Sequence, residues 1–205
     1  MLKDKIQLHS VNFGCDPEFF FEKNGTIIGS EKVIDIKKGL KAGTNSKFIV
    51  DGVQAEINPM PNTCRKILAG EISQCFASLN REMAKDKTLK LNFKPTIKIS
   101  KKELASLDEK SKVFGCAPSQ NINPKSRNSV KIKDPQKYMY RSAGGHIHIG
   151  KLPGSNGLDQ VAVILREPER LITIMDIIVG NTCVLLDRDP SNKERRKVSM
   201  VTGMW

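Results

Sequence analysis

Short strand-like segments joined by tight turns dominate the first hundred residues and restrict the folds open to the chain. Residues 11–22, VNFGCDPEFFFE, favour a β-strand, and the "KNG" that follows predicts a hairpin turn into "TIIG". Residues 47–58, KFIVDGVQAEIN, predict a strand pair or one long bent strand closed by "PMPN". Residues 89–100, LKLNFKPTIKIS, alternate with the period of two that is typical of a strand with one wet face. Together these segments predict a mostly antiparallel sheet.

Helical patterns are interleaved with the strands. After Asn62 or Thr63, either of which can cap a helix, apolar residues recur at spacings of three and four. The segment "KKELASLDEK" predicts a short helix, and residues 158–180 carry another apolar helical pattern that Pro168 would kink. This order of elements predicts an α+β fold, one domain over residues 1–205, with helices packed on one face of the sheet. The expected buried face of the first helix comprises Ile67, Leu68, Ile72, Cys75, Phe76, Leu79 and Met83.

Composition excludes several classes of protein. A hydrophobic content of 39% predicts a folded chain, and no apolar run approaches the roughly 20 residues that a membrane helix needs. The first residues, MLKDKIQLHSVNF, lack the apolar centre of a signal peptide, so we expect a cytoplasmic protein without a membrane partner. Five cysteines without a CxxC pair argue against a disulfide framework or a zinc cluster. They are Cys15, Cys64, Cys75, Cys116 and Cys183.

The formal net charge of +12 suits an anionic partner. Nucleic acid, a nucleoside triphosphate and an acidic substrate would all use this charge, and solubility alone would also explain it. The lysines are spread along the chain, and no basic–aromatic platform for stacking bases is evident in the sequence. Nucleic acid is therefore the less favoured partner.

Two of the three histidines lie in "RSAGGHIHIG". On a strand, His146 and His148 would point to the same face. Such a pair can bind one metal together, or one imidazole can bind metal while the other contacts a phosphate. The flanking Gly144 and Gly145 would let a ligand or another backbone come close. The alternative is a pair of structural histidines on a sheet surface.

Carboxylates show the same spacing. Asp16 and Glu18 share one strand face, and Glu56 shares another with Gln54 and Asn58. Hard divalent cations such as Mg²⁺ take several oxygen ligands, often completed by water and substrate phosphates. The alternatives are a simple turn at the Asp–Pro step and an exposed strand position for the single glutamate.

A basic cluster at Arg195 and Arg196 completes the set. Acids that hold metal, a histidine that completes its coordination and an arginine that meets phosphate are the components of phosphoryl transfer. The pattern of residues thus favours an enzyme that uses a nucleotide and a divalent cation.

Five motifs carry a family resemblance: "GCDPEFFF", "DGVQAEINPMP", "FGCAPSQ", "RSAGGHIHIG" and "LLDRDPSNKERR". In this order and at these distances, they resemble phage-encoded carboxylate–amine ligases, a group similar to glutamine synthetase and γ-glutamylcysteine synthetase. Glutamine synthetase carries an acid-x-acid strand, a "GQxE" strand and a glycine-rich "HxH" strand that line one active-site sheet. The resemblance spans residues 13 to 200 and implies a glutamine synthetase-like catalytic fold.

The resemblance also implies a reaction and its cofactors. It implies ATP-dependent joining of a small-molecule or peptide carboxylate to an amine through an acyl-phosphate, with Mg²⁺ or Mn²⁺ as the metal. Asp16 and His146 would share one cation, Glu18 and Glu56 would hold the other, and Asp51 would be a further ligand.

The remaining implied roles concern the nucleotide. His148 would approach the ATP phosphates, and Arg196, with Arg195 or Arg141 as alternatives, would stabilise the transferring γ-phosphoryl group. The glycines and amides beside the acids and histidines are candidate nucleotide contacts: Gly144, Gly145, Gln54 and Asn58.

The sequence departs from the family pattern in two places, and these departures leave other functions open. Asp16 stands where glutamine synthetase has glutamate, although aspartate is usual in the phage group. The relatives continue after "ERR" into further strands bearing an arginine and an acid, whereas this sequence stops at "VTGMW", so we expect either a fragment or a shortened form of the fold. A non-catalytic phage protein that binds nucleotide, metal or a partner is the first alternative, and a basic nucleic-acid-binding domain ranks below it.

The sequence says less about the substrates, the oligomeric state and the cellular location of the protein. Residues 30–46 and 117–140 are candidate loops for the substrate pocket, and their sequences do not specify the carboxylate or the amine. Both a monomer and an oligomer are compatible with the motifs. If the gene belongs to a phage, the protein would act in the cytoplasm of the infected host cell.

Overall fold

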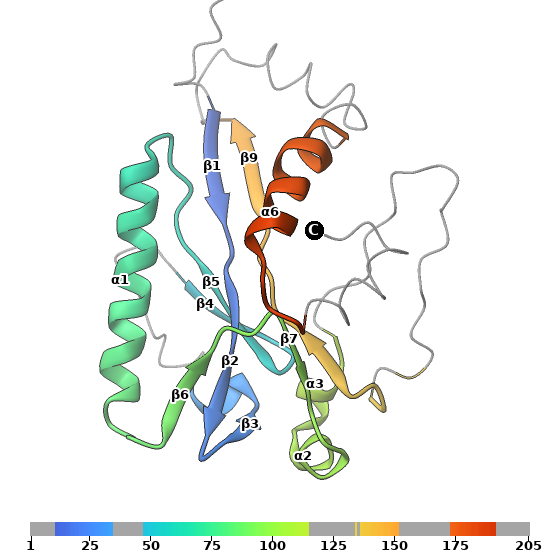
Figure 1. The fold of residues 1–205 in the computed structure, drawn as a ribbon. Helices are drawn as coiled ribbons and strands as arrows, with labels where there is room; N and C mark the ends of the chain where they lie inside the picture. The colour runs from blue at the N-terminus through green and yellow to red at the C-terminus, as the bar shows by residue number, and fades with distance from the viewer. Residues whose placement is uncertain (1–10, 35–46, 115–133, 135, 152–172, 192–205) are drawn as a thin grey trace, which may run out of the picture.

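The structure is a computed structural model that describes residues 11–34, 47–114, 134, 136–151 and 173–191 (Figure 1). It confirms a mixed α+β architecture in which all the strand pairings of the described residues are antiparallel. Within the same residues, no helix is long and apolar enough to cross a membrane. In chain order the elements are β1 (Val11–Cys15), β2 (Glu18–Lys23), β3 (Thr26–Ile28), η2 (Ser30–Lys32), β4 (Lys47–Asp51), β5 (Gln54–Asn58), α1 (Arg65–Met83), β6 (Leu89–Asn92), β7 (Thr96–Lys98), α2 (Lys101–Ser106), α3 (Glu109–Lys112), β8 (Tyr140–Ser142), β9 (Ile147–Lys151), η4 (Asp176–Gly180) and α6 (Asn181–Leu186).

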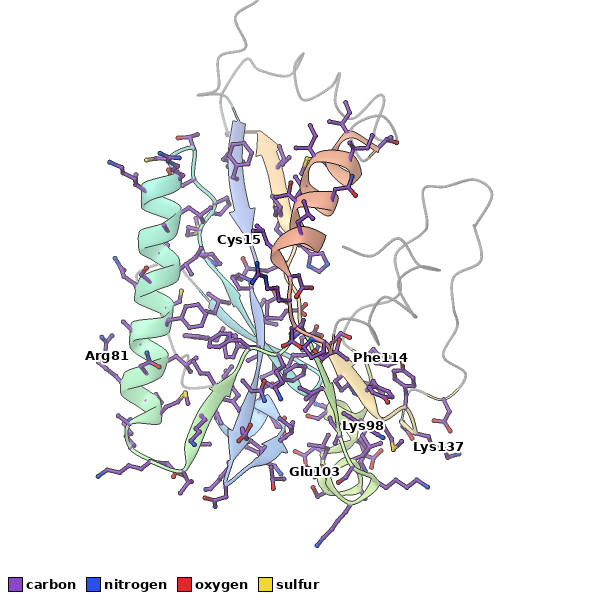
Figure 2. The ribbon with its side chains drawn as sticks, in the orientation of Figure 1. Cys15, Arg81, Lys98, Glu103, Phe114 and Lys137 are labelled. Carbon is purple, nitrogen blue, oxygen red and sulfur yellow. The ribbon has the colours of Figure 1, made fainter. Side chains whose placement is uncertain are left out.

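The strand predicted over residues 11–22 is interrupted at Asp16–Pro17, where the chain changes partners. Before the break, β1 pairs with β9, and after it β2 pairs with β3, β5 and β6. Proline has no N–H to donate to a sheet ladder, but its carbonyl still accepts. The Pro17 carbonyl takes a hydrogen bond from the Ile57 N–H at 3.1 Å, which holds the break against β5. Figure 2 shows Cys15 at the end of β1, just before this break.

Two predicted hairpins are present. Asn24 and Gly25 join β2 to β3 with φ angles of 51° and 78°, the left-handed pair that a two-residue hairpin turn requires. Residues 47–58 form a strand pair, β4 and β5, one of the two predicted alternatives, with Gly52 in the turn at φ 59°. The single strand predicted over residues 89–100 is wrong, because the segment forms two strands.

These two strands, β6 and β7, belong to different sheets. β6 pairs with β2, whereas β7 pairs with β8. Pro95 lies between them and cannot donate to a ladder, while its carbonyl accepts from the Ala143 N–H at 3.0 Å. The short helix predicted from "KKELASLDEK" is present as α2 and α3. Ser100 and Glu103 form a reciprocal capping box at the start of α2 (Glu103 is labelled in Figure 2).

Helix α1 begins later than predicted and buries only its second half. It starts after Cys64, whose N–H donates to the Asn62 side chain at 2.9 Å. Ile67 in its first turn is 52% exposed, whereas Cys75, Leu79 and Met83 are buried.

The core has two parts, on opposite faces of β2. Phe19 and Phe21 pack with α1, Ala55 and Ile57 in one cluster. The residue between them, Phe20, packs in a second cluster that includes Leu104 of α2 and Val53. This is the period-two alternation of a strand buried on both faces. It corrects the prediction that helices pack on one face of the sheet.

Several predictions fall outside the described residues. These are the helical pattern over residues 158–172 and most of the two candidate substrate loops. Residues 173–186 are helical and continue that pattern through η4 and α6 (Figure 1).

Candidate functional site

Three carboxylates meet on the central sheet, and we call them the acidic group: Glu18, Asp51 and Glu56. The register pairs Glu18 of β2 directly with Glu56 of β5, and Asp51 ends the neighbouring strand β4. Carboxylate oxygens of the three residues lie within 4.8 Å of one another. Because Ala55 and Ile57 point into the core beneath α1, the alternating Glu56 points to the opposite face.

The acidic group brings carboxylates from three strands together on one face of the sheet. Burial, and after it the nearby carboxylates of Asp16, Glu18 and Asp51, together raise the pKa of Glu56 to about 7, while His146 acts in the opposite direction. The charged form of a carboxyl group in such surroundings would be stabilised by a cation bound between it and its neighbours.

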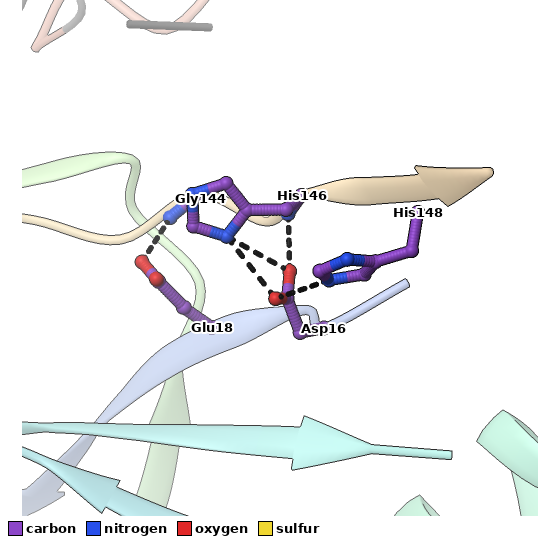
Figure 3. A network of polar contacts seen from close by, with 5 residues as sticks. All are labelled: Asp16, Glu18, Gly144, His146 and His148. Carbon is purple, nitrogen blue, oxygen red and sulfur yellow. Dashed lines mark hydrogen bonds and ion pairs between the residues drawn. The ribbon is translucent and has the colours of Figure 1, made fainter. Parts of the chain in front are cut away.

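A second cluster, the histidine group, lies beside the first and comprises Asp16, His146 and His148 (Figure 3). The Asp16 carboxylate contacts His146 Nδ1 through both oxygens, at 3.2 and 3.1 Å, and His148 Nε2 at 2.9 Å. The same carboxylate accepts a hydrogen bond from the backbone N–H of His146. The register of β1 with β9, in which Gly14 opposes His148, brings these residues together.

Backbone contacts join residues 144–148, which we call the histidine segment, to β2. The Gly144 N–H donates to Glu18 Oε2 at 2.7 Å, and the Glu18 N–H donates to the Gly144 carbonyl at 3.0 Å. A Cβ placed on Gly145 would lie 3.3 Å from both the Asp16 carbonyl oxygen and Pro17 Cα. Of the two uses foreseen for these glycines, close approach of another backbone is therefore the one present at Gly145.

The two groups differ in access to solvent. The Asp16 side chain is 9% exposed, whereas the side chains of His146 and His148 are 44% and 62% exposed. A buried carboxylate thus orients two accessible imidazoles, an arrangement in which a ligand can meet the rings without displacing the residue that holds them.

The donor set fits a divalent cation. Clustered carboxylate oxygens are the ligands that Mg²⁺ and Mn²⁺ take, and an imidazole can join them. Burial and, after it, the neighbouring carboxylates disfavour the charged form of Glu56 and raise its pKa. Glu18, Asp51 and Glu56 are therefore suited to one cation, whereas the Asp16 carboxylate is engaged with both imidazoles and orients them.

The structure places the other candidate residues away from this donor set or in other contacts. Gln54 is buried, and its Nε2 donates to the Ser142 carbonyl at 2.8 Å. Asn58 is exposed at the end of β5. Arg195 and Arg196 lie outside the described residues.

Arg141 is not placed to meet a phosphate, which corrects its candidacy as a catalytic arginine. Its side chain is 1% exposed, and its guanidinium donates to the carbonyls of Lys112 at 2.6 Å, Tyr140 at 3.0 Å and Tyr138. The group also lies over the Phe114 ring, 4.9 Å from its centroid. A guanidinium engaged in this way fastens β8 to the end of α3.

Sequence reasoning missed residues that support the site through contacts distant along the chain. The buried hydroxyl of Ser111 lies 2.7 Å from Glu31 Oε2 and 3.1 Å from the carbonyl of Gly52, next to Asp51. The Ser142 carbonyl receives the Gln54 amide. Single serines in α3 and β8 carry no local pattern that would have identified them.

Comparisons of the chain with protein-family models, with curated proteins and with solved structures find no match. The α+β class and the arrangement of the site rest on the sequence and the structure alone.

Proposed function

We propose that this protein is an ATP-dependent carboxylate–amine ligase that forms an amide bond through an acyl-phosphate intermediate. The observation that carries the proposal is the grouping of Glu18, Asp51 and Glu56 within 4.8 Å. Beside this group, Asp16 holds the two histidines. The reaction class comes from the resemblance of the five sequence motifs to such ligases.

The residues divide into two cation positions. Glu18, Asp51 and Glu56 would hold one divalent cation, and His146, oriented by Asp16 at Nδ1, would offer its Nε2 to the other. Bound Mg²⁺ would supply neutralisation of the phosphate charge that builds up during phosphoryl transfer. The carboxylates would hold the cation in place before the reaction begins, so that little reorganisation would be needed when negative charge develops on the phosphate.

The histidines have orientations set by Asp16. The carboxylate contacts Nδ1 of His146 and Nε2 of His148, so the opposite ring nitrogens, Nε2 and Nδ1 respectively, are available to a ligand. We assign His148 to the ATP phosphates. Arg196, or Arg195, is assigned to the γ-phosphoryl group from the sequence pattern alone.

The reaction balances in two steps. A substrate carboxylate oxygen attacks the γ-phosphorus of ATP, and ADP leaves with the electrons of the broken P–O bond. The amine nitrogen then attacks the acyl carbon, phosphate leaves, and the nitrogen loses a proton. Neither step requires a covalent nucleophile from the protein.

The test is a search for the condensation product. The protein is incubated with ATP, Mg²⁺ and pooled amino acids or cell-wall peptides, and mass spectrometry looks for a product formed with loss of water. We expect amine-dependent phosphate release that falls about 100-fold in Glu18→Gln and Glu56→Gln. Glu109→Gln, at a surface glutamate of α3 paired with Lys112, is the matched control and should retain activity.

The outcomes separate this proposal from its alternatives. Cation and ATP binding that depends on Glu18 and Glu56 but never leads to amine-dependent phosphate release would indicate a non-catalytic protein of the same fold. Salt-sensitive binding of DNA that is indifferent to both substitutions would indicate a nucleic-acid-binding domain.

A further inference from the structure

Gln54 connects the two parts of the molecule that supply the site. The acidic group lies on the sheet formed by β2, β4 and β5, whereas the histidine segment follows β8, which pairs with β7 in a separate two-stranded sheet. From β5, the Gln54 side chain reaches across and donates its amide N–H to the Ser142 carbonyl of β8 at 2.8 Å.

Both ends of this connection are fixed. Gln54 is 8% exposed, and its own carbonyl accepts a hydrogen bond from the hydroxyl of the fully buried Ser30 at 2.6 Å. At the other end, Ser142 pairs with Thr96 of β7, and the next residue, Ala143, donates to the Pro95 carbonyl at 3.0 Å. The amide therefore joins two anchored backbones.

The position of the connection in the chain gives it a consequence for the site. In β5, Gln54 lies two residues before Glu56 on the same face and opposes Asp51 in the register. Ser142 lies two residues before Gly144, whose N–H donates to Glu18, and four before His146, which contacts Asp16. A shift at the Gln54–Ser142 contact would displace the histidine group relative to the acidic group.

We infer that Gln54 is a positioning residue: together with the Glu18–Gly144 contacts, its amide sets the distance between the acidic group and the two histidines, in place of the nucleotide contact that the sequence suggested. The assignment of a cation to these groups rests on the proposed function, but the positioning of the histidines does not. Glutamine suits the task because it is neutral and donates, whereas a glutamate would bring a further negative charge toward the crowded carboxylates.

Gln54→Leu tests the inference, because it keeps most of the side-chain volume and removes the donor. Gln54→Asn keeps the amide and shortens its reach by one methylene. Gln74→Leu, at an exposed glutamine of α1, is the matched control. Circular dichroism and thermal unfolding first establish which variants are folded, and the readouts are taken from those.

Two readouts separate positioning from simple stabilisation. The chain has three histidines, so selective ¹⁵N labelling of the imidazoles gives three sets of ring signals. We expect the His146 and His148 signals to move in Gln54→Leu and Gln54→Asn, and not in Gln74→Leu. We also expect Mn²⁺ affinity, measured by calorimetry, to fall about 10-fold to 100-fold in both Gln54 variants.

Unchanged imidazole signals in a folded Gln54 variant would overturn the inference, and so would Mn²⁺ affinity equal to that of Gln74→Leu. If the wild-type protein binds no Mn²⁺, the proposed cation site fails, and the imidazole signals alone decide whether Gln54 positions the histidines. Unfolding of both Gln54 variants under conditions in which Gln74→Leu remains folded would show a general structural role and would also overturn the inference.

Discussion

At the scale of single residues, the main feature of the site is the charge of its clustered carboxyl groups. Burial, together with the neighbouring carboxylates of Asp16, Glu18 and Asp51, raises the pKa of Glu56 to about 7. A structure that crowds acids in this way loses stability unless protons or cations compensate the charge.

The raised pKa predicts how stability depends on pH. Folded Glu56 holds its proton up to about pH 7, whereas the unfolded chain releases it near 4.5, so the folded state binds more protons between these values. Stability contributed by this group is therefore lost as the pH rises from about 4.5 through about 7. Without divalent cations, we expect Glu56→Gln to lose less stability than the wild type over this window.

The measurement is thermal unfolding in the presence of a chelator at pH 5, 6, 7 and 8. Glu109→Gln, at a surface position, should follow the wild-type profile. Parallel profiles for the wild type and Glu56→Gln would contradict the account of the charge at the acidic group.

Residue patterns predicted which side chains share a face. The period of two in β5 placed Gln54, Glu56 and Asn58 on one face, and the buried Ala55 and Ile57 confirm that alternation. The burial of Arg141 could not be predicted, because the carbonyls that hold it come from α3 and from the segment before β8. A sequence shows the charge of an arginine but not the acceptors that surround it.

At the scale of elements, prolines decide where the strands end. The strand predicted over residues 11–22 breaks at Pro17, and the one predicted over residues 89–100 breaks at Pro95. In both places the chain leaves one partner strand for another. Composition and alternation predicted extended structure at these segments, but the choice of partner depends on residues distant in the chain. Local turn chemistry predicted the β2–β3 hairpin, because Asn24 and Gly25 adopt its angles readily.

The turn between β8 and β9 must approach the Asp16–Pro17 break closely, and this predicts an effect of Gly145→Ala. The added Cβ would lie 3.3 Å from backbone atoms of both Asp16 and Pro17. Since neither backbone atom can turn aside as a side-chain end would, we expect a loss of about 1–3 kcal/mol in the free energy of unfolding.

Gly70→Ala is the control for this substitution. Gly70 lies within α1 with nothing within 4 Å of the added Cβ, so this change should stabilise the fold by about 0.5–1 kcal/mol. Chemical denaturation measures both free energies. A Gly145→Ala variant as stable as the wild type would show that the close approach is not required.

At the scale of the whole molecule, the site exists only where separate sheets meet. The two-stranded sheet of β1 and β9, the sheet built around β2 and the two-stranded sheet of β7 and β8 each contribute residues or backbone contacts to it. His148 and Asp16 are 132 positions apart in the sequence. Motif order indicated that such residues belong together, whereas their distances follow from registers that no local pattern encodes.

The central claim is that Glu18, Asp51 and Glu56 hold a divalent cation. The most direct measurement is anomalous diffraction from crystals soaked in Mn²⁺, for the wild type and for Glu56→Gln. We predict an anomalous peak between the three carboxylates in the wild type, strongly reduced in Glu56→Gln. The absence of a peak at that position in the wild type, or an equal peak in the variant, would contradict the claim.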